Sequence, residues 1–198
     1  NYNGTHPNGG VLVVFGDDHP GKSSSIGHQS DPALAANSIP VLFPATIQEY
    51  IDYGLHGFAL SRYASVVVGF KCVNETVTAT STVEIDPDRI SINLPQGTVC
   101  PEGGIHIRPE YDPIGQDVRM VRHKLPRVLA YARANRLDRV AFGHSRPTRL
   151  GIVTSGKAYL DCVAALHQLD IDESKAKTMG IGLYKVGMVW PLEPQGLK

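Results

Sequence analysis

Three short runs of apolar, mostly β-branched residues alternate with helical patterns in the first part of the chain. The runs cover Val11–Phe15, Ile39–Phe43 and Ser65–Phe70, and helical patterns over 32–37 and 46–63 separate them. Continuous runs of this kind are typical of strands that are buried on both faces of a parallel sheet. The order strand, helix, strand, helix, strand predicts an α/β layer with right-handed crossovers.

A second α/β pattern begins at Leu150. A strand is predicted over Gly151–Thr154, a helix with one apolar face over 158–169, and a further strand over Ile181–Val186. The two patterns together predict an α/β protein whose parallel sheets are flanked by helices.

The segment between the two patterns has a different composition. Residues 85–115 hold five prolines and several glycines, with weak strand signals only at 90–94 and 105–108. Such a composition is typical of an extended connector or a small β insertion.

A basic helix is expected after this connector. Asp117 would cap it, it would run to about Asn135, and Pro126 would kink or break it near Lys124. Basic helices can bind nucleic acid, but the 198-residue chain has 19 Lys and Arg against 19 Asp and Glu, so its net charge is zero. A neutral chain argues against nucleic acid and anionic membranes as partners. We therefore interpret the basic residues as a solvated helix face.

The cysteines and the hydropathy pattern suggest a compartment. Cys72, Cys100 and Cys162 have no metal-ligand spacing, and their odd number fits a reducing environment better than a disulfide framework. No apolar run approaches the roughly 20 residues that span a bilayer, and a signal-peptide pattern is absent. A cytoplasmic protein is expected, with no membrane partner.

A polar loop follows the first predicted strand, at the place where ligands gather in α/β sheets. Residues 17–29 contain two carboxylates, two histidines, three serines and a lysine. Four metal ligands from one short loop would be an awkward set, and adjacent aspartates often cap turns, so no metal site is expected. Gly21–Ser24 loosely resembles a phosphate-binding P-loop, but the two aspartates beside it would repel phosphate.

Two further positions are candidates for binding. Lys71 lies at the carboxyl end of the third strand and could hold a substrate anion, or simply pair with Glu75. The turn Ser155–Lys157 could accept an anion on backbone N–H groups, or serve only as a tight strand-to-helix turn. Trp190 is expected to pack rather than to recognise a ligand.

Two blocks of residues resemble one enzyme family. Gly16–His19, Lys22–Ser24 and His28–Asp31 are similar to a motif of the indolepyruvate ferredoxin oxidoreductases, which are thiamine-diphosphate enzymes of the 2-oxoacid:ferredoxin oxidoreductase superfamily. Residues 151–157 and 183–194 are similar to the start of the next domain of that family.

The resemblance implies that the chain is an internal piece of a large enzyme. Residues 1–85 would be the later half of the pyrimidine-binding thiamine-diphosphate domain, 86–149 the connector with the basic helix, and 150–198 the start of a transketolase-C-terminal-like domain. In the family, an aryl 2-oxoacid is decarboxylated on the cofactor, electrons pass through iron–sulfur clusters to ferredoxin, and coenzyme A takes the acyl group. The full enzyme would be a homodimer, with other domains of the same polypeptide as partners.

The resemblance also implies site residues. Lys71 matches a basic residue that contacts the carboxylate of the 2-oxoacid. The activating glutamate, the diphosphate and Mg²⁺ site and the cluster cysteines would lie outside these residues, so the piece itself would bind no cluster and be inactive. The loop that faces the thiamine site would contribute Asp17, Asp18, His19, Ser23, Ser24, His28 and Gln29.

Two functions of other classes stay open from the residues alone. One is a non-catalytic protein–protein interaction module that docks through the basic helix and exposed half-sheets. The other is a nucleotide-binding α/β protein that uses Ser155–Lys157.

Overall fold

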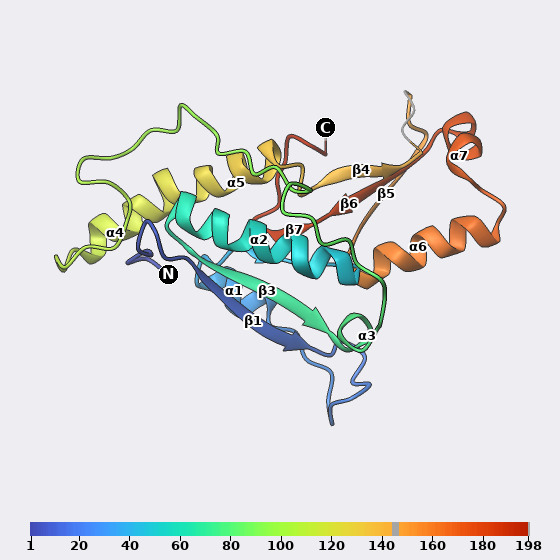
Figure 1. Ribbon diagram of the computed structural model, residues 1–198, viewed down its shortest axis with the longest axis horizontal. Coiled ribbons are helices and arrows are strands. Elements are labelled where there is room, and N and C mark those ends of the chain that lie inside the picture. Colours follow the sequence, from blue (N-terminus) through green and yellow to red (C-terminus); the bar gives the residue numbers. More distant parts are fainter. Residues whose placement is uncertain (144–146, 198) are drawn as a thin grey trace.

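The computed structural model describes residues 1–143 and 147–197, which form two small β-sheets with helices packed against them (Figure 1). The predicted α/β class with parallel strands and flanking helices is confirmed. Each sheet also has one antiparallel strand that the sequence did not predict. None of the helices within these two ranges has the length and apolarity that a bilayer span requires.

The first sheet has four strands in the order β1-β3-β2-β7. β1 (Val11–Asp17) and β2 (Val41–Leu42) both run parallel to β3 (Val67–Val73), which lies between them. β7 (Met188–Trp190) comes from the far end of the sequence and pairs antiparallel with β2. This sheet therefore contains residues from both sides of the predicted connector.

β1 lies at the edge of this sheet, which corrects the prediction that it is buried on both faces. It has one neighbouring strand, β3, and the side chain of Val14 is 64% exposed. The central strand β3 is buried as predicted, with Val68 fully covered. A continuous apolar run thus indicated strand structure correctly but did not reveal how many neighbours the strand has.

The second sheet has three strands in the order β4-β6-β5. β5 (Leu150–Ser155) runs parallel to β6 (Ile181–Val186), and β4 (Arg139–Phe142) pairs antiparallel with β6. Both strands predicted in this region are confirmed. Helices α6 (Gly156–Gln168) and α7 (Glu173–Met179) connect β5 to β6. Together these elements bury a small apolar cluster of Leu166, Ile171, Ala176, Ile181 and Leu183.

Helix α2 (Ile47–Ala64) begins with the capping pattern that its sequence predicts. The Thr46 hydroxyl accepts a hydrogen bond from the Glu49 backbone N–H at 3.2 Å. The Glu49 carboxylate reaches back to the Ala45 N–H at 2.8 Å. The first bond satisfies an amide that a helix start otherwise leaves unpaired, and the second satisfies the N–H of the residue just before the N-cap.

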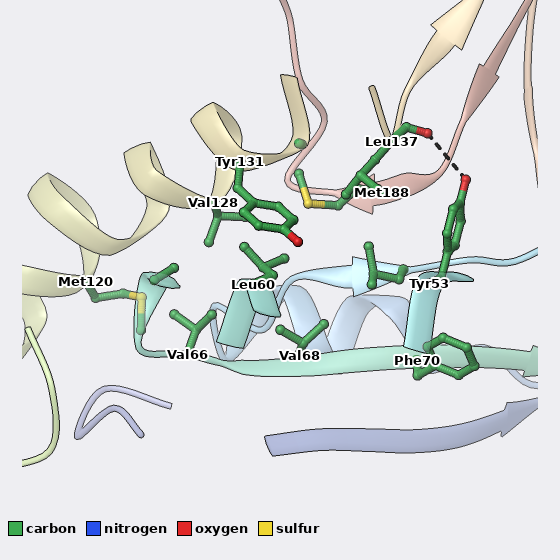
Figure 2. Close-up of a cluster of buried hydrophobic side chains, with 13 residues drawn as sticks. Tyr53, Leu60, Val66, Val68, Phe70, Met120, Val128, Tyr131, Leu137 and Met188 are labelled. Atoms are coloured by element: carbon green, nitrogen blue, oxygen red, sulfur yellow. Dashed lines mark hydrogen bonds between the residues drawn. The ribbon is translucent and has the colours of Figure 1, made fainter. Parts of the chain in front are cut away.

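The main hydrophobic core lies between α2, β3 and helix α5 (Leu125–Ala134). Figure 2 shows Leu60 of α2 lying between Val68 of β3 and Tyr131 of α5. The Tyr131 hydroxyl is hydrogen-bonded to His56 Nδ1 at 3.0 Å, so its buried polar end has a partner. The core as a whole contains Leu42, Tyr53, Leu60, Ala64, Val66, Val68, Phe70, Met120, Val128, Tyr131, Ala132, Leu137 and Met188.

The connector is an extended segment between the four-residue helix α3 (Asn74–Val77) and α4 (Pro113–Arg119), drawn as the long green stretch in Figure 1. The strand signals at 90–94 and 105–108 were wrong, because neither segment pairs with another strand. Ile105 is nevertheless buried, so the connector is anchored to the rest of the protein.

The basic helix begins earlier than predicted. Its cap is Asp112, whose carboxylate accepts a hydrogen bond from the Gly115 N–H at 2.9 Å, and Asp117 lies inside α4. A π-helical turn, Met120–Lys124, joins α4 to α5. The irregularity predicted beside Pro126 is confirmed as this turn, whose wider spacing accommodates a residue that lacks an N–H.

Lys124 is buried, which corrects for this residue the prediction of a solvated basic helix face. It is 1% exposed, and its ammonium donates to the Tyr2 carbonyl at 2.9 Å. Burial, with the positive charges of Arg119 and Arg108 nearby, lowers the pKa of Lys124 to about 8.

Glu49 also joins α2 to the second sheet. Its Oε1 accepts a hydrogen bond from the fully buried Lys185 of β6, and lies 3.3 Å from Arg139 of β4. The Lys185 ammonium lies 5.3 Å and 5.2 Å from the ring centroids of Tyr53 and Tyr159. Burial by itself would raise the pKa of Glu49, but Lys185 and the other hydrogen-bond donors hold it below its usual value.

Candidate functional site

A cavity of about 630 Å³ lies where several segments of the chain meet. Its wall comes from the loop after β1, helix α1 (Asp31–Ala36), the residue after β2, the end of β3 with α3, the start of α6, and β7. The loop at 17–29, Lys71 and the turn Ser155–Lys157, which were separate candidates in the sequence, therefore meet at one cavity. The lining residues are His19, Pro20, Gln29, Asp31, Pro32, Ala35, Phe43, Lys71, Val73, Glu75, Ser155, Lys157, Ala158, Val189 and Trp190.

Lys71 is buried in the cavity wall beside two carboxylates. Its ammonium pairs with Asp31 Oδ2 and lies 3.3 Å from Asp17 Oδ2. It also lies 4.9 Å from the ring centroid of Phe43. The alternative of a simple surface pair with Glu75 is therefore wrong, because Lys71 turns inward to the two aspartates.

Asp17 is held ionised beneath the cavity. Both of its carboxylate oxygens accept from the Ser30 N–H, at 3.0 Å and 3.1 Å, and the Ser30 hydroxyl donates at 2.7 Å. His28 Nδ1 lies 3.3 Å from the same carboxylate. Burial works against ionisation, but the Ser30 bonds and Lys71 together hold the pKa of Asp17 below its usual value.

Asp18 organises the tip of the loop. Its carboxylate accepts from the backbone N–H groups of Lys22, Ser23 and Ser24 at 2.9, 2.6 and 2.8 Å. These bonds, led by that from Ser23, hold the pKa of Asp18 well below its usual range despite burial. Residues 16–23 have the complete G-x₄-G-K-S spacing of a P-loop, which the sequence reasoning did not recognise. The amide donors that would cradle a phosphate are taken by Asp18.

The first residue of α6 packs against Phe43, which lines the cavity. Gly156 has φ +51°, and a Cβ added there would lie 2.2 Å from the Phe43 ring. Ser155 stands at the N-cap without a side-chain hydrogen bond to the helix. Lys157 pairs with Asp161 at 2.5 Å, on the exposed side of the helix. The turn thus packs tightly on Phe43 while its neighbours border the cavity.

The seven predicted loop residues separate into three groups. His19 and Gln29 line the cavity, whereas Asp17 and Asp18 are buried and occupied by hydrogen bonds within the chain. The exposed Ser23, Ser24 and His28 surround these carboxylates without lining the cavity. The described residues contain no group of three or more His, Cys, Asp or Glu placed to hold a metal ion.

Sequence reasoning missed part of the site. Trp190 was expected only to pack, yet it lines the cavity together with Val189. Phe43 and Asp31 were read as a strand end and a helix start. The pairing of β7 with β2 brings Trp190 next to this part of the first sheet, and no local signal in the sequence predicts that pairing.

Comparisons with known proteins agree with the resemblance read from the motifs. Residues 139–198 match the family model described as the indolepyruvate oxidoreductase domain. A solved 2-oxoglutarate:ferredoxin oxidoreductase from Magnetococcus marinus, with 2-oxoglutarate, coenzyme A and succinyl-CoA bound, matches with a TM-score of 0.56 at 15% identity. The resemblance to 2-oxoacid:ferredoxin oxidoreductases is confirmed.

The structural match spans most of this chain but a smaller part of the solved protein. It covers 91% of this chain and 37% of the Magnetococcus oxidoreductase chain, so this chain spans little more than a third of that protein. At 15% identity the match shows a shared fold. No curated protein sequence matches the chain significantly.

Proposed function

We propose that these residues form part of an oxidoreductase that oxidatively decarboxylates indolepyruvate or a related aryl 2-oxoacid to the acyl-CoA, with ferredoxin as electron acceptor. The observation that carries the proposal is the cavity at the ends of β1 and β3. It combines an apolar wall, which includes Phe43 and Trp190, with the buried cation of Lys71. An apolar pocket with a few placed polar groups suits an aryl acid.

Thiamine diphosphate, when bound, supplies the carbanion chemistry that releases CO₂ from a 2-oxoacid. We propose that the described residues supply only one wall of such a site. The loop amides are occupied by Asp18, and the described residues offer no cluster of metal ligands. We propose that other domains of the same polypeptide, in a homodimer, hold the diphosphate, Mg²⁺, the iron–sulfur clusters and coenzyme A.

Calorimetric titration of this chain with thiamine diphosphate and Mg²⁺ tests whether other domains are needed to hold the cofactor. We expect no binding at micromolar cofactor if the diphosphate contacts lie in other domains, as proposed. A micromolar dissociation constant for the chain alone would contradict the proposal.

We further propose that Lys71 faces the carboxylate of the substrate. In the full-length enzyme, Lys71→Met should raise the Michaelis constant for the 2-oxoacid about tenfold or more, because one charge-assisted contact is lost. Lys175→Met, which removes an exposed lysine of α7, is the matched control and should leave the kinetics unchanged. Unaltered kinetics in Lys71→Met would exclude a contact between Lys71 and the substrate carboxylate.

A further inference from the structure

Helix α4 and the π-helical turn after it present apolar side chains to solvent. Ile114, Val118 and Val121 are 79%, 41% and 57% exposed, and their spacing places them on one side of the helix. Tyr111, just before the helix, is 91% exposed. We call Ile114, Val118 and Val121 the α4 stripe. An exposed group of large apolar residues on one helix side indicates an interaction surface.

The packing of the core does not account for the α4 stripe. The helix continues from α4 through the π-helical turn into α5, and it supplies Met120, Val128 and Tyr131 to the main core, where all three are fully buried. Val121 directly follows Met120 but is more than half exposed. In Figure 1, α4 lies at the end of the molecule far from the second sheet. The described residues therefore cover one side of this helix and leave the α4 stripe open.

Two charges of opposite sign border the α4 stripe. Asp117 precedes Val118 by one residue and Arg122 follows Val121 by one, so the two charges lie on opposite sides of the stripe. Both residues are exposed, and neither forms an ion pair with another described residue. An apolar centre with a negative charge on one side and a positive charge on the other is complementary to a second copy of itself.

We propose that the α4 stripe packs against the α4 stripe of a second copy of this chain, with the two helices parallel about a twofold axis. Asp117 of each subunit then lies beside Arg122 of the partner subunit, and the symmetry gives this ion pair twice. An antiparallel arrangement would set each side of the stripe beside the same side of the partner, aspartate with aspartate and arginine with arginine. The inference deepens the proposed function, because it rests on the homodimer proposed there and assigns a surface to it.

Disulfide trapping in the full-length enzyme tests the parallel contact. After mild oxidation, Ile114→Cys should form a 114–114 crosslink between subunits, because equivalent residues of two parallel helices meet at the axis. Leu169→Cys, which is 67% exposed at the end of α6, is the matched control and should form none. Peptide mass spectrometry identifies the linked positions, so that crosslinks through the exposed native Cys100 are counted separately.

The double variant Ile114→Cys/Val121→Cys reports the direction of the two helices. A parallel pair yields 114–114 and 121–121 links, whereas an antiparallel pair yields 114–121 links between subunits. A folded full-length enzyme without the 114–114 link, or with 114–121 links in its place, would overturn the inference.

Charge reversal tests the two ion pairs. In the Ile114→Cys background, Asp117→Arg and Arg122→Asp should each slow the 114–114 crosslinking about fivefold or more, because two attractive pairs become repulsive. The double reversal Asp117→Arg/Arg122→Asp should bring the rate back to within about threefold of the starting value. Asp88→Arg, at an exposed position of the connector, is the control and should leave the rate unchanged. Unchanged rates in both single reversals, or no recovery in a folded double reversal, would overturn the inference.

The inference and the proposed function fail separately. Turnover of an aryl 2-oxoacid is measured on the same full-length preparations. An active enzyme that is a monomer, or whose α4 stripe is covered by another domain of its own chain and gives no crosslink, would overturn the inference and leave the proposed function intact. A dimer with the 114–114 crosslink and no turnover would support the inference and contradict the proposed function.

Discussion

The ammonium of Lys185 on β6 lies against the carboxylate of Glu49 on α2, inside the protein. The contact ties the helix that caps the first sheet to the central strand of the second. Because both groups are removed from water, the pair stabilises the protein only while both charges are present.

Lys185→Met should therefore be strongly destabilising. It leaves the buried Glu49 carboxylate with Arg139 as its remaining cation, and breaking such a pair costs about 3–5 kcal/mol. Urea unfolding of the chain measures the loss. Lys177→Met removes an exposed i,i+4 pair with Glu173 and should change stability by no more than about 0.5 kcal/mol. The double variant Glu49→Gln/Lys185→Met should recover part of the loss, and a Lys185→Met chain as stable as wild type would contradict the prediction.

Gly156→Ala should destabilise the chain by roughly 2–4 kcal/mol, since it adds left-handed backbone strain and overpacking. The added methyl group would meet the Phe43 ring at 2.2 Å, and φ at this position is +51°. Gly151→Ala in β5 is the matched control, because a Cβ there meets no atom within 4 Å. Denaturant midpoints of the two variants should differ clearly, and equal midpoints would show that Phe43 can move aside.

Lys124 gives stability a distinct dependence on alkaline pH. Its pKa in the folded chain is about 8, whereas an unfolded lysine titrates near 10.4. Between these values the unfolded chain binds the additional proton, so stability rises with pH by up to about 1.4 kcal/mol per pH unit. Below pH 8 both states are protonated and this contribution is constant.

The comparison with Lys124→Met isolates that contribution from every other titrating group. The difference in unfolding free energy between wild type and variant should grow in favour of wild type from about pH 8 to 10. Lys175→Met removes an exposed lysine and should show no such slope. A difference that is independent of pH would mean that Lys124 has an ordinary pKa in the folded chain.

Asp18→Ala should loosen the tip of the loop. Hydrogen exchange at the amides of Lys22, Ser23 and Ser24 should become roughly tenfold or more faster, because their shared acceptor is removed. Since the pKa of Asp18 lies well below its usual range, wild-type protection should persist below the pH at which an ordinary aspartate becomes protonated. Ser25→Ala, at the exposed neighbouring position, should leave exchange unchanged, and the opposite pattern would show that other contacts order the loop.

Local signals predicted the elements well where side-chain periodicity and capping determine them. The Thr46–Glu49 spacing predicted the start of α2, and the β-branched runs predicted β3 and β6. The edge position of β1 was missed because an apolar run does not encode its number of neighbours. The connector signals failed because alternating apolar residues form a strand only when another strand is available to pair.

The site was predictable only in pieces. The loop at 17–29 and Lys71 were candidates because each lies at the end of a strand, and both contribute to one cavity. The ion pair between Asp31 and Lys71 could not be predicted from the sequence, because the two residues lie 40 residues apart and meet only through the packing of α1 on the sheet. The roles of these residues toward cofactor and substrate, and the division of the chain at 85 and 149, stay predictions.

The pairing of β7 with β2 affects how the chain can be divided in the laboratory. The C-terminal segment supplies an edge strand to a sheet built largely from the N-terminal one, so the N-terminal half lacks one strand of its sheet when the two are separated. Two polypeptides made by interrupting the connector should associate when mixed, as in split-protein complementation. The segment that matches the indolepyruvate oxidoreductase domain thus contains the whole three-stranded sheet and also one edge strand of the other sheet.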